Sequence, residues 1–309
     1  MNHPIKFIVG LAITVALTLP LHAAGTSSAQ FLKMGAGARA AAMGDAFVSV
    51  ADDASATYWN PAGLNQVKVP ELSLMQANAL VQTQYQFLGA VIPVHHDAIG
   101  LVIQRMDYGT MDTYSADDVN TGNFNAGSMA AGLCASFDIH PGITLGLTGK
   151  YIGETIASKS ANTYAADIGV LLKERLFNRF NFGFVVQNMG GKLKFLDQSE
   201  SLPQIIRTGI STRFFDRHLL ASFDYSIPND NAGSIHAGLE FNVNSLFILR
   251  GGYQATPGNS LKVDGIKNIT AGMGLNIGVI GIDYAFVPYG DLGQIHRISA
   301  LLKFNTSNL

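Results

Sequence analysis

From Glu71 onward the chain is a series of segments about ten residues long, in which apolar and polar residues alternate. In segment 234–243, for example, Ile235, Leu239 and Phe241 share one face, while His236 and Glu240 share the other. Side chains on a β-strand point alternately to opposite faces, so each segment needs apolar surroundings on one side and a polar space on the other. Beyond the N-terminal region no apolar run reaches the roughly 18 residues that indicate a membrane-spanning helix.

Two architectures produce such alternation, a soluble β-sandwich and a transmembrane β-barrel. A sandwich turns its polar face to water, where Lys and Glu are common. Here charged residues are only 14% of the chain against 48% hydrophobic, and the polar face is mostly Gly, Ser, Thr and Asn. Open sheet edges are not tolerated in lipid, so a spanning sheet must close on itself. The sequence therefore predicts an all-β fold with a transmembrane barrel over residues 71–304, and the sandwich is the alternative.

Turn signals divide the barrel region into fourteen antiparallel strands. The predicted strands are 71–78, 85–94, 97–107, 126–139, 143–155, 163–173, 180–188, 205–215, 218–227, 234–243, 246–254, 267–276, 278–287 and 295–304. Short turns such as His95-His96 alternate with longer loops at 108–125, 156–162, 189–204, 228–233, 255–266 and 288–294. Outer-membrane barrels have short periplasmic turns and longer outside loops. We therefore expect both termini in the periplasm, with residues 305–309 as a short tail.

Residues 1–24 have the pattern of an export signal. Lys6 supplies the positive charge, residues 7–19 form the apolar core, Pro20 interrupts it, and Ala23-Ala24 supply the small residues of a cleavage site. A membrane-anchoring helix is the alternative, although the apolar run is shorter than the roughly 20 residues that a span needs. The signal predicts delivery to the bacterial outer membrane.

Residues 25–70 are rich in Ala and Gly and are predicted to form a plug inside the barrel, because small residues let backbone pack closely. A buried charge needs a partner. We therefore expect Arg39 to reach a lumen acid (Asp224, Glu240 or Asp283) and Asp52-Asp53 to meet Arg207, Arg250 or Arg297. The plug would end in a tight turn, whose residues are Trp59, Asn60, Pro61, Ala62 and Gly63. The polar residues expected to face the lumen are Lys150, Asp167, Asp224, His236, Glu240, Arg250, Asp283 and Arg297. The alternative is a periplasmic tail that does not contact the lumen.

Several stretches resemble a known family. They are Phe31-Leu-Lys-Met-Gly-Ala-Gly-Ala-Arg39, Met43-Gly-Asp-Ala-Phe47, Asp52-Asp-Ala-Ser-Ala-Thr-Tyr-Trp-Asn-Pro-Ala-Gly-Leu64, Asn188-Met-Gly190, Arg250-Gly-Gly-Tyr253 and the segment 282–293. Together they resemble the PorV/PorQ family, which is similar to the FadL long-chain fatty-acid transporters. The resemblance implies a fourteen-stranded barrel with an N-terminal hatch, and Asn60-Pro61-Ala62 matches the hatch motif.

The resemblance leaves two functions open. PorV/PorQ proteins serve type IX secretion, so the first is a docking component that holds secreted proteins with C-terminal signal domains, or other secretion components. The second is a FadL-like transporter of hydrophobic ligands. Partners would then be outer-membrane lipid together with such proteins or ligands.

Other site types find little support in the sequence. Gly35-x-Gly37 lacks the strand-turn-helix context of a nucleotide site, and the His95-His96 pair has no further ligands nearby. A net charge of −2 gives no basic field for nucleic acid. We therefore expect no enzyme activity, no catalytic residue, no cofactor and no metal.

Overall fold

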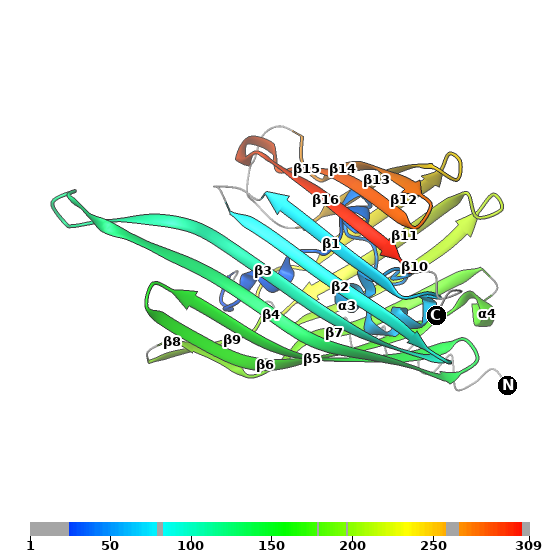
Figure 1. Cartoon of the computed structure of the whole chain (residues 1–309), viewed down its shortest axis with the longest axis horizontal. Coiled ribbons are helices and arrows are strands. Elements are labelled where there is room, and N and C mark those ends of the chain that lie inside the picture. Colours follow the sequence, from blue (N-terminus) through cyan, green and yellow to red (C-terminus); the bar gives the residue numbers. More distant parts are fainter. Residues whose placement is uncertain (1–24, 79–82, 178, 196, 258–265, 305–309) are drawn as a thin grey trace.

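The computed structural model describes residues 25–78, 83–177, 179–195, 197–257 and 266–304, and these form a closed antiparallel β-barrel (Figure 1). The predicted export signal (1–24) and tail (305–309) lie outside the described residues. Fourteen strands make the barrel, which confirms the predicted fold. They are β1 (Glu71–Asn78), β2 (Gln84–Val94), β3 (Asp97–Tyr114), β4 (Asn120–His140), β5 (Ile143–Ile156), β6 (Lys159–Leu172), β7 (Phe180–Gly190), β10 (Ile205–Phe214), β11 (Leu219–Pro228), β12 (Ser234–Asn242), β13 (Phe247–Ala255), β14 (Ile269–Ile277), β15 (Ile280–Pro288) and β16 (Gln294–Lys303). The barrel closes where β1 pairs with β16, from Glu71 opposite Lys303 to Asn78 opposite His296.

Because residue types alternate along each strand, apolar side chains cover the outside of the barrel and small or polar side chains face its lumen. On β12, Leu239 is 52% exposed and Phe241 is 46% exposed on the outside, whereas Glu240 is buried inside. A ring of exposed apolar side chains fits lipid, and a closed sheet leaves no strand edge unpaired there. The barrel is therefore a membrane-spanning one and not a soluble sandwich. Among the described residues, no helix is long and apolar enough to cross a bilayer.

The two ends of the barrel differ in their connections. At one end, here the turn end, short connections such as 95–96 and 141–142 join neighbouring strands, and α4 (Glu174–Phe177) lies in the connection from β6 to β7. At the other, the loop end, β3 and β4 continue past the rim as a long hairpin, and β8 (Lys192–Phe195) pairs with β9 (Gln198–Ser201). Expectations for this end were partly wrong, because segments 108–125, 156–162 and 189–204 contain strand residues. Outside lipid a hairpin needs no apolar face, so its backbone pairs without the alternation that marks the other strands.

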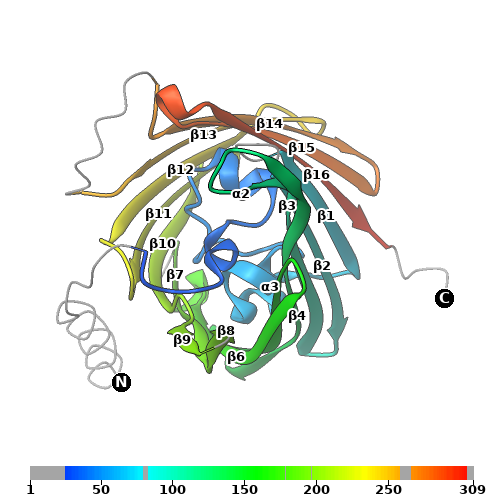
Figure 2. The same ribbon diagram turned by 90° about the vertical axis from the view of Figure 1, so that its left-hand side faces the viewer.

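The N-terminal segment runs through the lumen from the loop end to the turn end (Figure 2). It contains η1 (Gln30–Lys33), α2 (Ala38–Ala42), α3 (Ala56–Trp59) and η2 (Pro61–Gln66). Gly25 N donates to Asp230 O at the loop end (3.0 Å), and Asn65 Nδ2 donates to His96 O at the turn end (2.8 Å). Residues 25–70 are called the plug below.

The first and last described residues lie at opposite ends of the barrel, whereas the two chain termini lie outside the described residues, so that their expected periplasmic location stays a prediction. Gly25 lies at the loop end, whereas Phe304 N donates to Pro70 O (2.8 Å) at the turn end, next to the start of β1. The strand count alone placed the two ends of the barrel domain together. It could not show that the plug doubles back through the lumen and carries its first residue to the far side.

The plug has an apolar core of its own. Trp59 is fully buried, its ring meets that of Tyr58 edge to face at 4.9 Å between centroids, and its Nε1 donates to Ala36 O (2.8 Å). Phe47 packs on the same indole at 6.2 Å between centroids. Burying three aromatic rings supplies much of the hydrophobic stabilisation available to so short a segment. The plug is thus a folded unit and not an extended strap.

Wall glycines let the plug backbone touch the barrel. At eight positions a Cβ atom would collide with plug atoms; these are Gly89, Gly100, Gly146, Gly169, Gly183, Gly238, Gly252 and Gly272. Gly146, for example, lies directly against the backbone of Pro61 and Ala62. On the plug side Gly44 has φ +64°, a conformation that favours glycine, and its amide donates to Thr270 Oγ1 (3.0 Å). The plug and wall are therefore fitted to each other at the level of the backbone.

Candidate functional site

A buried ion-pair network fixes the plug to the wall in the turn-end half of the lumen. Arg39, on α2, donates from Nε to Glu240 Oε2 (2.6 Å) and from Nη2 to Glu240 Oε1 (3.0 Å), a two-pronged contact across to β12. The same guanidinium binds Asp52 (2.6 Å) and Asp53 (2.8 Å) of the plug. Burial by itself lowers the pKa of Arg39, but Asp52, Glu240 and Asp53 outweigh it and hold that pKa above its usual range. The charge on Arg39 is therefore permanent.

The network continues along the wall in both directions. Arg250 on β13 donates to Glu240 (2.8 Å) and to Asp283 on β15 (2.6 Å), while Arg213 on β10 donates to Asp52 (2.7 Å). Of the three acids expected for Arg39, the partner in the structure is Glu240. Alternating charges of this kind satisfy one another where water is scarce.

The partners expected for the Asp52-Asp53 pair differ from those observed. Asp52 binds Arg39 and Arg213, and Asp53 binds Arg39 and accepts from Ser55 Oγ (2.6 Å), so Arg207, Arg250 and Arg297 are not their partners. Sequence reasoning did not identify Arg213 as a partner of Asp52, because Arg213 lies near the end of its strand, where charged residues are usually exposed to solvent. The plug fold turns Asp52 toward that end, and no local sequence pattern reports this.

The remaining expected acid and its cationic neighbours hold other parts of the plug. Asp224 Oδ2 accepts from Val48 N (2.8 Å), and Arg297 Nη1 donates to Gly35 O (2.7 Å). Arg207 lies over the Trp59 ring, 4.9 Å from its centroid, and over the Tyr58 ring at 5.7 Å. A guanidinium over an aromatic face is attracted by the ring's charge distribution. Each of these wall residues therefore contacts the plug.

Where the sequence predicted a tight turn, α3 ends at Trp59 and η2 begins at Pro61, and Asn60 joins the two helices. Its Oδ1 accepts from Ala62 N (3.1 Å) and caps η2, while its Nδ2 donates to Val48 O (3.0 Å) and to Val170 O on β6 (3.2 Å). Pro61 occupies the first position of the helix, where its missing amide costs nothing. Gly63 lies against the backbone of Ala51. One side chain thus joins the two halves of the plug to the wall.

The three remaining residues expected to face the lumen, Lys150, Asp167 and His236, also have polar partners. Lys150 on β5 pairs with Asp167 on β6 (2.8 Å) and also contacts Asn188 Oδ1. Asn188 N donates to Asp167 Oδ1 (2.8 Å) where the β6–β7 register shifts. His236 Nδ1 lies 2.7 Å from Gly44 O. All eight residues expected to face the lumen therefore have polar partners among the described residues.

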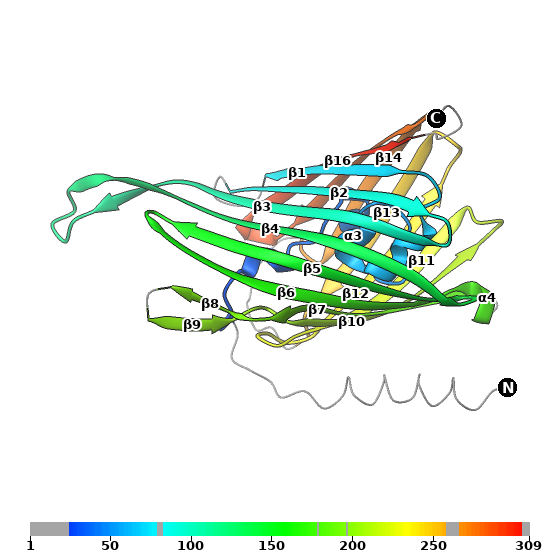
Figure 3. The same cartoon turned by 60° about the horizontal axis from the view of Figure 1, so that its bottom comes forward.

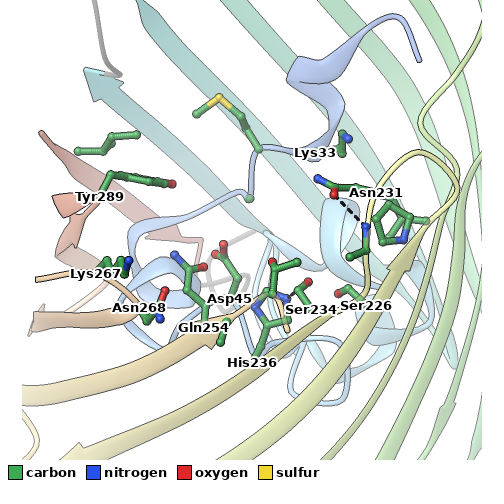
Figure 4. Close-up of a pocket in the computed structure, with 18 of the residues that line it drawn as sticks. Lys33, Asp45, Ser226, Asn231, Ser234, His236, Gln254, Lys267, Asn268 and Tyr289 are labelled. Carbon is green, nitrogen blue, oxygen red and sulfur yellow. Dashed lines mark hydrogen bonds between the residues drawn. The ribbon is translucent and has the colours of Figure 1, made fainter. Parts of the chain in front are cut away.

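Above the plug, the loop-end half of the lumen holds a cavity of about 800 Å³ (Figure 4). Plug residues Lys33, Met34, Gly35 and Asp45 contribute to its lining, and barrel strands and loops supply the rest. Its charged or ionisable lining residues are Lys33, Asp45, Arg207, His236, Lys267 and Arg297. Its apolar lining includes Met34, Met106, Ile205, Leu292, Ile295 and Tyr289. The cavity is called the vestibule below.

The first residues of the plug are tied to the rim of the vestibule by one buried acid that sequence reasoning missed. Asp230 accepts from Lys33 Nζ (2.8 Å) and Gln30 Nε2 (2.8 Å), and Ser27 Oγ also contacts it. Burial by itself raises the pKa of Asp230, but the hydrogen bonds from Lys33, Ser27 and Gln30 outweigh it and hold that pKa below its usual range. Asp230 stands in a polar Asn-Asp-Asn loop, which gave no sign of burial.

The remaining candidate residues of the sequence lie apart from one another. Among the described residues no three His, Cys, Asp or Glu side chains gather as metal ligands. His95 and His96 lie in an exposed turn at the turn end. Cys134 is buried behind the plug, with its Sγ 3.7 Å from Thr57 O.

Several solved structures of outer-membrane transporters are similar to this barrel. The toluene transporter TodX of Pseudomonas putida aligns over 86% of this chain and 96% of its own, with a TM-score of 0.64 and 12% identity. The toluene transporter TbuX of Ralstonia pickettii aligns over 88% and 99%, with a TM-score of 0.63 and 15% identity. A Pseudomonas aeruginosa FadL homologue aligns over 93% and 100%, with a TM-score of 0.59 and 12% identity. No protein-family model and no curated protein matches the sequence. The chain therefore has a FadL-like barrel fold.

Proposed function

We propose that this protein is an outer-membrane channel that admits small hydrophobic molecules through the vestibule, with the plug as its gate and the loop end facing outward. The observation that carries the proposal is the vestibule of about 800 Å³, because its lower side is formed by the plug itself. A molecule bound there touches Met34 and Asp45, so binding and plug position are coupled through direct contact. Similarity to toluene transporters and a FadL homologue supports this choice of ligand class.

The vestibule lining fits a molecule with an apolar body and one polar group. Aliphatic side chains cover much of the wall, and ligand sites typically combine such a lining with a few polar groups that fix orientation. Arg207 and Arg297 both line the cavity and are buried, and Nε of each has no hydrogen-bond partner among the described residues. These two guanidinium groups would orient the polar end of the ligand.

Filling the vestibule tests the proposal. Gln254→Trp enlarges a lining side chain that points into the lumen, like Arg250 and Gly252 on the same strand, whereas Ala271→Trp adds an indole to the lipid-facing side of β14 (Figure 4). We expect uptake of octanoate, which has an apolar body and one polar group, by cells carrying the protein to fall with Gln254→Trp and to stay at the wild-type rate with Ala271→Trp. Equal uptake in both variants, at equal amounts of inserted barrel, would rule out passage through the vestibule.

A docking role is the second candidate, and the hairpin of β3 and β4 favours it. This hairpin and the β8–β9 hairpin extend from the loop end, where transport through the lumen does not require them (Figures 1 and 3). The PorV/PorQ resemblance of the plug sequence supports the same role in type IX secretion or surface attachment. Affinity purification of the tagged protein from its native membrane tests it. A type IX component, or secreted proteins that share a C-terminal domain, should be captured by the wild type and lost on deletion of residues 110–123 or 191–201.

A further inference from the structure

Among the residues that the structure describes, the part of the β3–β4 hairpin that projects beyond the barrel has an unpaired β3 edge and a β4 edge that is covered only at its base. Residues 108–125, here called the arm, pair only across the hairpin, because β3 pairs with β2 only up to Asp107 and β4 pairs with β5 only from Ala126. Figures 1 and 3 both show the arm reaching past the neighbouring strands. A β-bulge separates Asp107 from Thr110, and the five residues of β3 beyond it, from Thr110 to Tyr114, span about 17 Å at the rise of a strand. An edge of this length is a template for another strand.

The β3 edge is better suited to pairing than the β4 edge. It carries Tyr108, Thr110, Met111, Thr113 and Tyr114, which are residue types common in strands or large and apolar. The arm part of β4 reads Asn-Thr-Gly-Asn-Phe-Asn, which is poorer in such residues. At its base the β4 edge is also covered, because Ala157 N donates to Asn125 O (3.0 Å).

The direction of the backbone groups on this edge follows from contacts across the hairpin. Thr113 O accepts from Thr121 Oγ1 (3.1 Å), and Ser115 N donates to Val119 O (2.8 Å), so Thr113 and Ser115 turn their polar groups inward. On a strand in an antiparallel pair, alternate residues direct their N–H and C=O to opposite sides. Asp112 and Tyr114 therefore direct theirs away from the hairpin.

The charge of the arm selects the partner. Asp112, Asp117 and Asp118 lie on it, all three are exposed, and no Lys or Arg occurs between Arg105 and Lys150. Met111 and Tyr114 are 37% and 58% exposed beside these acids. We infer that the β3 edge of the arm binds an extended, basic segment of a partner protein, which adds to it as an antiparallel strand. Main-chain hydrogen bonds would supply affinity and the acids would supply specificity. The inference holds whether or not the vestibule conducts.

The test uses the whole protein in lipid nanodiscs with three peptides of equal length. One alternates Lys and Val, one alternates Glu and Val, and one alternates Lys and Pro and so keeps the charge but lacks half of the amide donors. We expect only the Lys-Val peptide to bind, and we expect it to slow amide hydrogen exchange at Asp112 and Tyr114. Replacing the three acids together by Asn should weaken its binding about tenfold, since each exposed charge pair contributes little alone.

Two single variants separate charge from strand pairing. Asp112→Asn removes the charge and keeps the outward backbone amide, whereas Asp112→Pro removes both. Slow hydrogen exchange at the Ser115 amide, which is bonded across the hairpin, shows in each variant that the hairpin is intact. We expect Asp112→Pro to weaken Lys-Val binding more than Asp112→Asn does. Equal binding of the Lys-Pro peptide, equal effects of the two variants, or binding without slowed exchange at Asp112 would each overturn strand addition. Loss of octanoate uptake in Gln254→Trp does not bear on any of these results.

Discussion

The contact between Arg39 and Glu240 predicts how firmly the plug is held. Glu240→Gln keeps the shape of the side chain and removes its charge. In the structure this carboxylate accepts two bonds from Arg39 and one from Arg250, and its side chain is only 4% exposed. The substitution therefore acts on a contact that joins the plug to the wall and leaves the strand pairing of β12 unchanged.

The expected magnitude follows from burial. Breaking a buried ion pair costs about 3–5 kcal/mol. Arg39 keeps Asp52 and Asp53 in the variant, so the loss lies at the lower end, about 3 kcal/mol. This loss falls on the free energy that separates the docked plug from the released plug. Since 1.36 kcal/mol corresponds to a factor of ten, the released population should rise about 100-fold.

Amide hydrogen exchange measures this population. The amides of Ala41, Met43 and Ala51 are hydrogen-bonded within the plug and should exchange about 100-fold faster in Glu240→Gln if they open with it. Glu174→Gln is the matched control, because Glu174 pairs with Arg217 at the surface (3.3 Å) and such pairs contribute about 0–1 kcal/mol. Exchange that rises less than about threefold, or equally in both variants, would refute the view that this contact holds the plug.

Two further predictions concern the fit and the rim of the plug. Gly146→Ala should reduce the amount of correctly assembled barrel in a heat-modified gel-mobility assay, because its Cβ would collide with the plug backbone and overpacking costs about 1–3 kcal/mol. Gly149→Ala is the control and should match the wild type, because its Cβ would meet no atom within 4 Å. Equal yields of the two variants would contradict the close fit between plug and wall. The pKa of Asp230 lies below its unfolded value of about 3.9, so its stabilising contribution is present above that pH and is lost as the pH falls through the lower folded value. Protection of the amides of residues 25–33, measured relative to the exchange rate of an unfolded chain at the same pH, should therefore fall below about pH 4 in the wild type. Asp230→Asn should show low protection already at neutral pH, and a wild type whose protection does not change with pH would contradict the role of Asp230.

The barrel was predictable because its constraint repeats along the chain. Every strand must place apolar residues toward lipid, so the pattern seen at Leu239 and Phe241 recurs in each segment, and errors in single positions do not change the strand count. The external hairpins were assigned as loops because they meet no such constraint. Residues such as Thr113 and Tyr114 lie beyond the barrel rim, and they are identified as strand residues only by their backbone pairing with β4.

The plug contacts were predictable by residue type but not by pairing. A buried Arg39 needs an acid, and the sequence offers several at lumen-facing positions. The choice of Glu240 depends on the height at which α2 lies in the barrel, which is set by contacts such as those of Gly44 and Gly252. The roles of Arg213 and Asp230 arise entirely from the path of the plug. That path is a property of the assembled fold and leaves no periodic trace in the sequence.

The path of the plug also has a consequence for assembly. The described part of the chain starts at Gly25 beside Asp230 and crosses the whole lumen before β1 starts. The β1–β16 seam must therefore close around a segment that already lies inside, or the part of the chain before β1 must be threaded through a finished ring. A small epitope ahead of Gly25 could pass by either route. A folded domain fused there could not be threaded, and it would be tolerated only if the sheet wraps the plug before the seam closes. Such a fusion would therefore report the order in which the molecule is built.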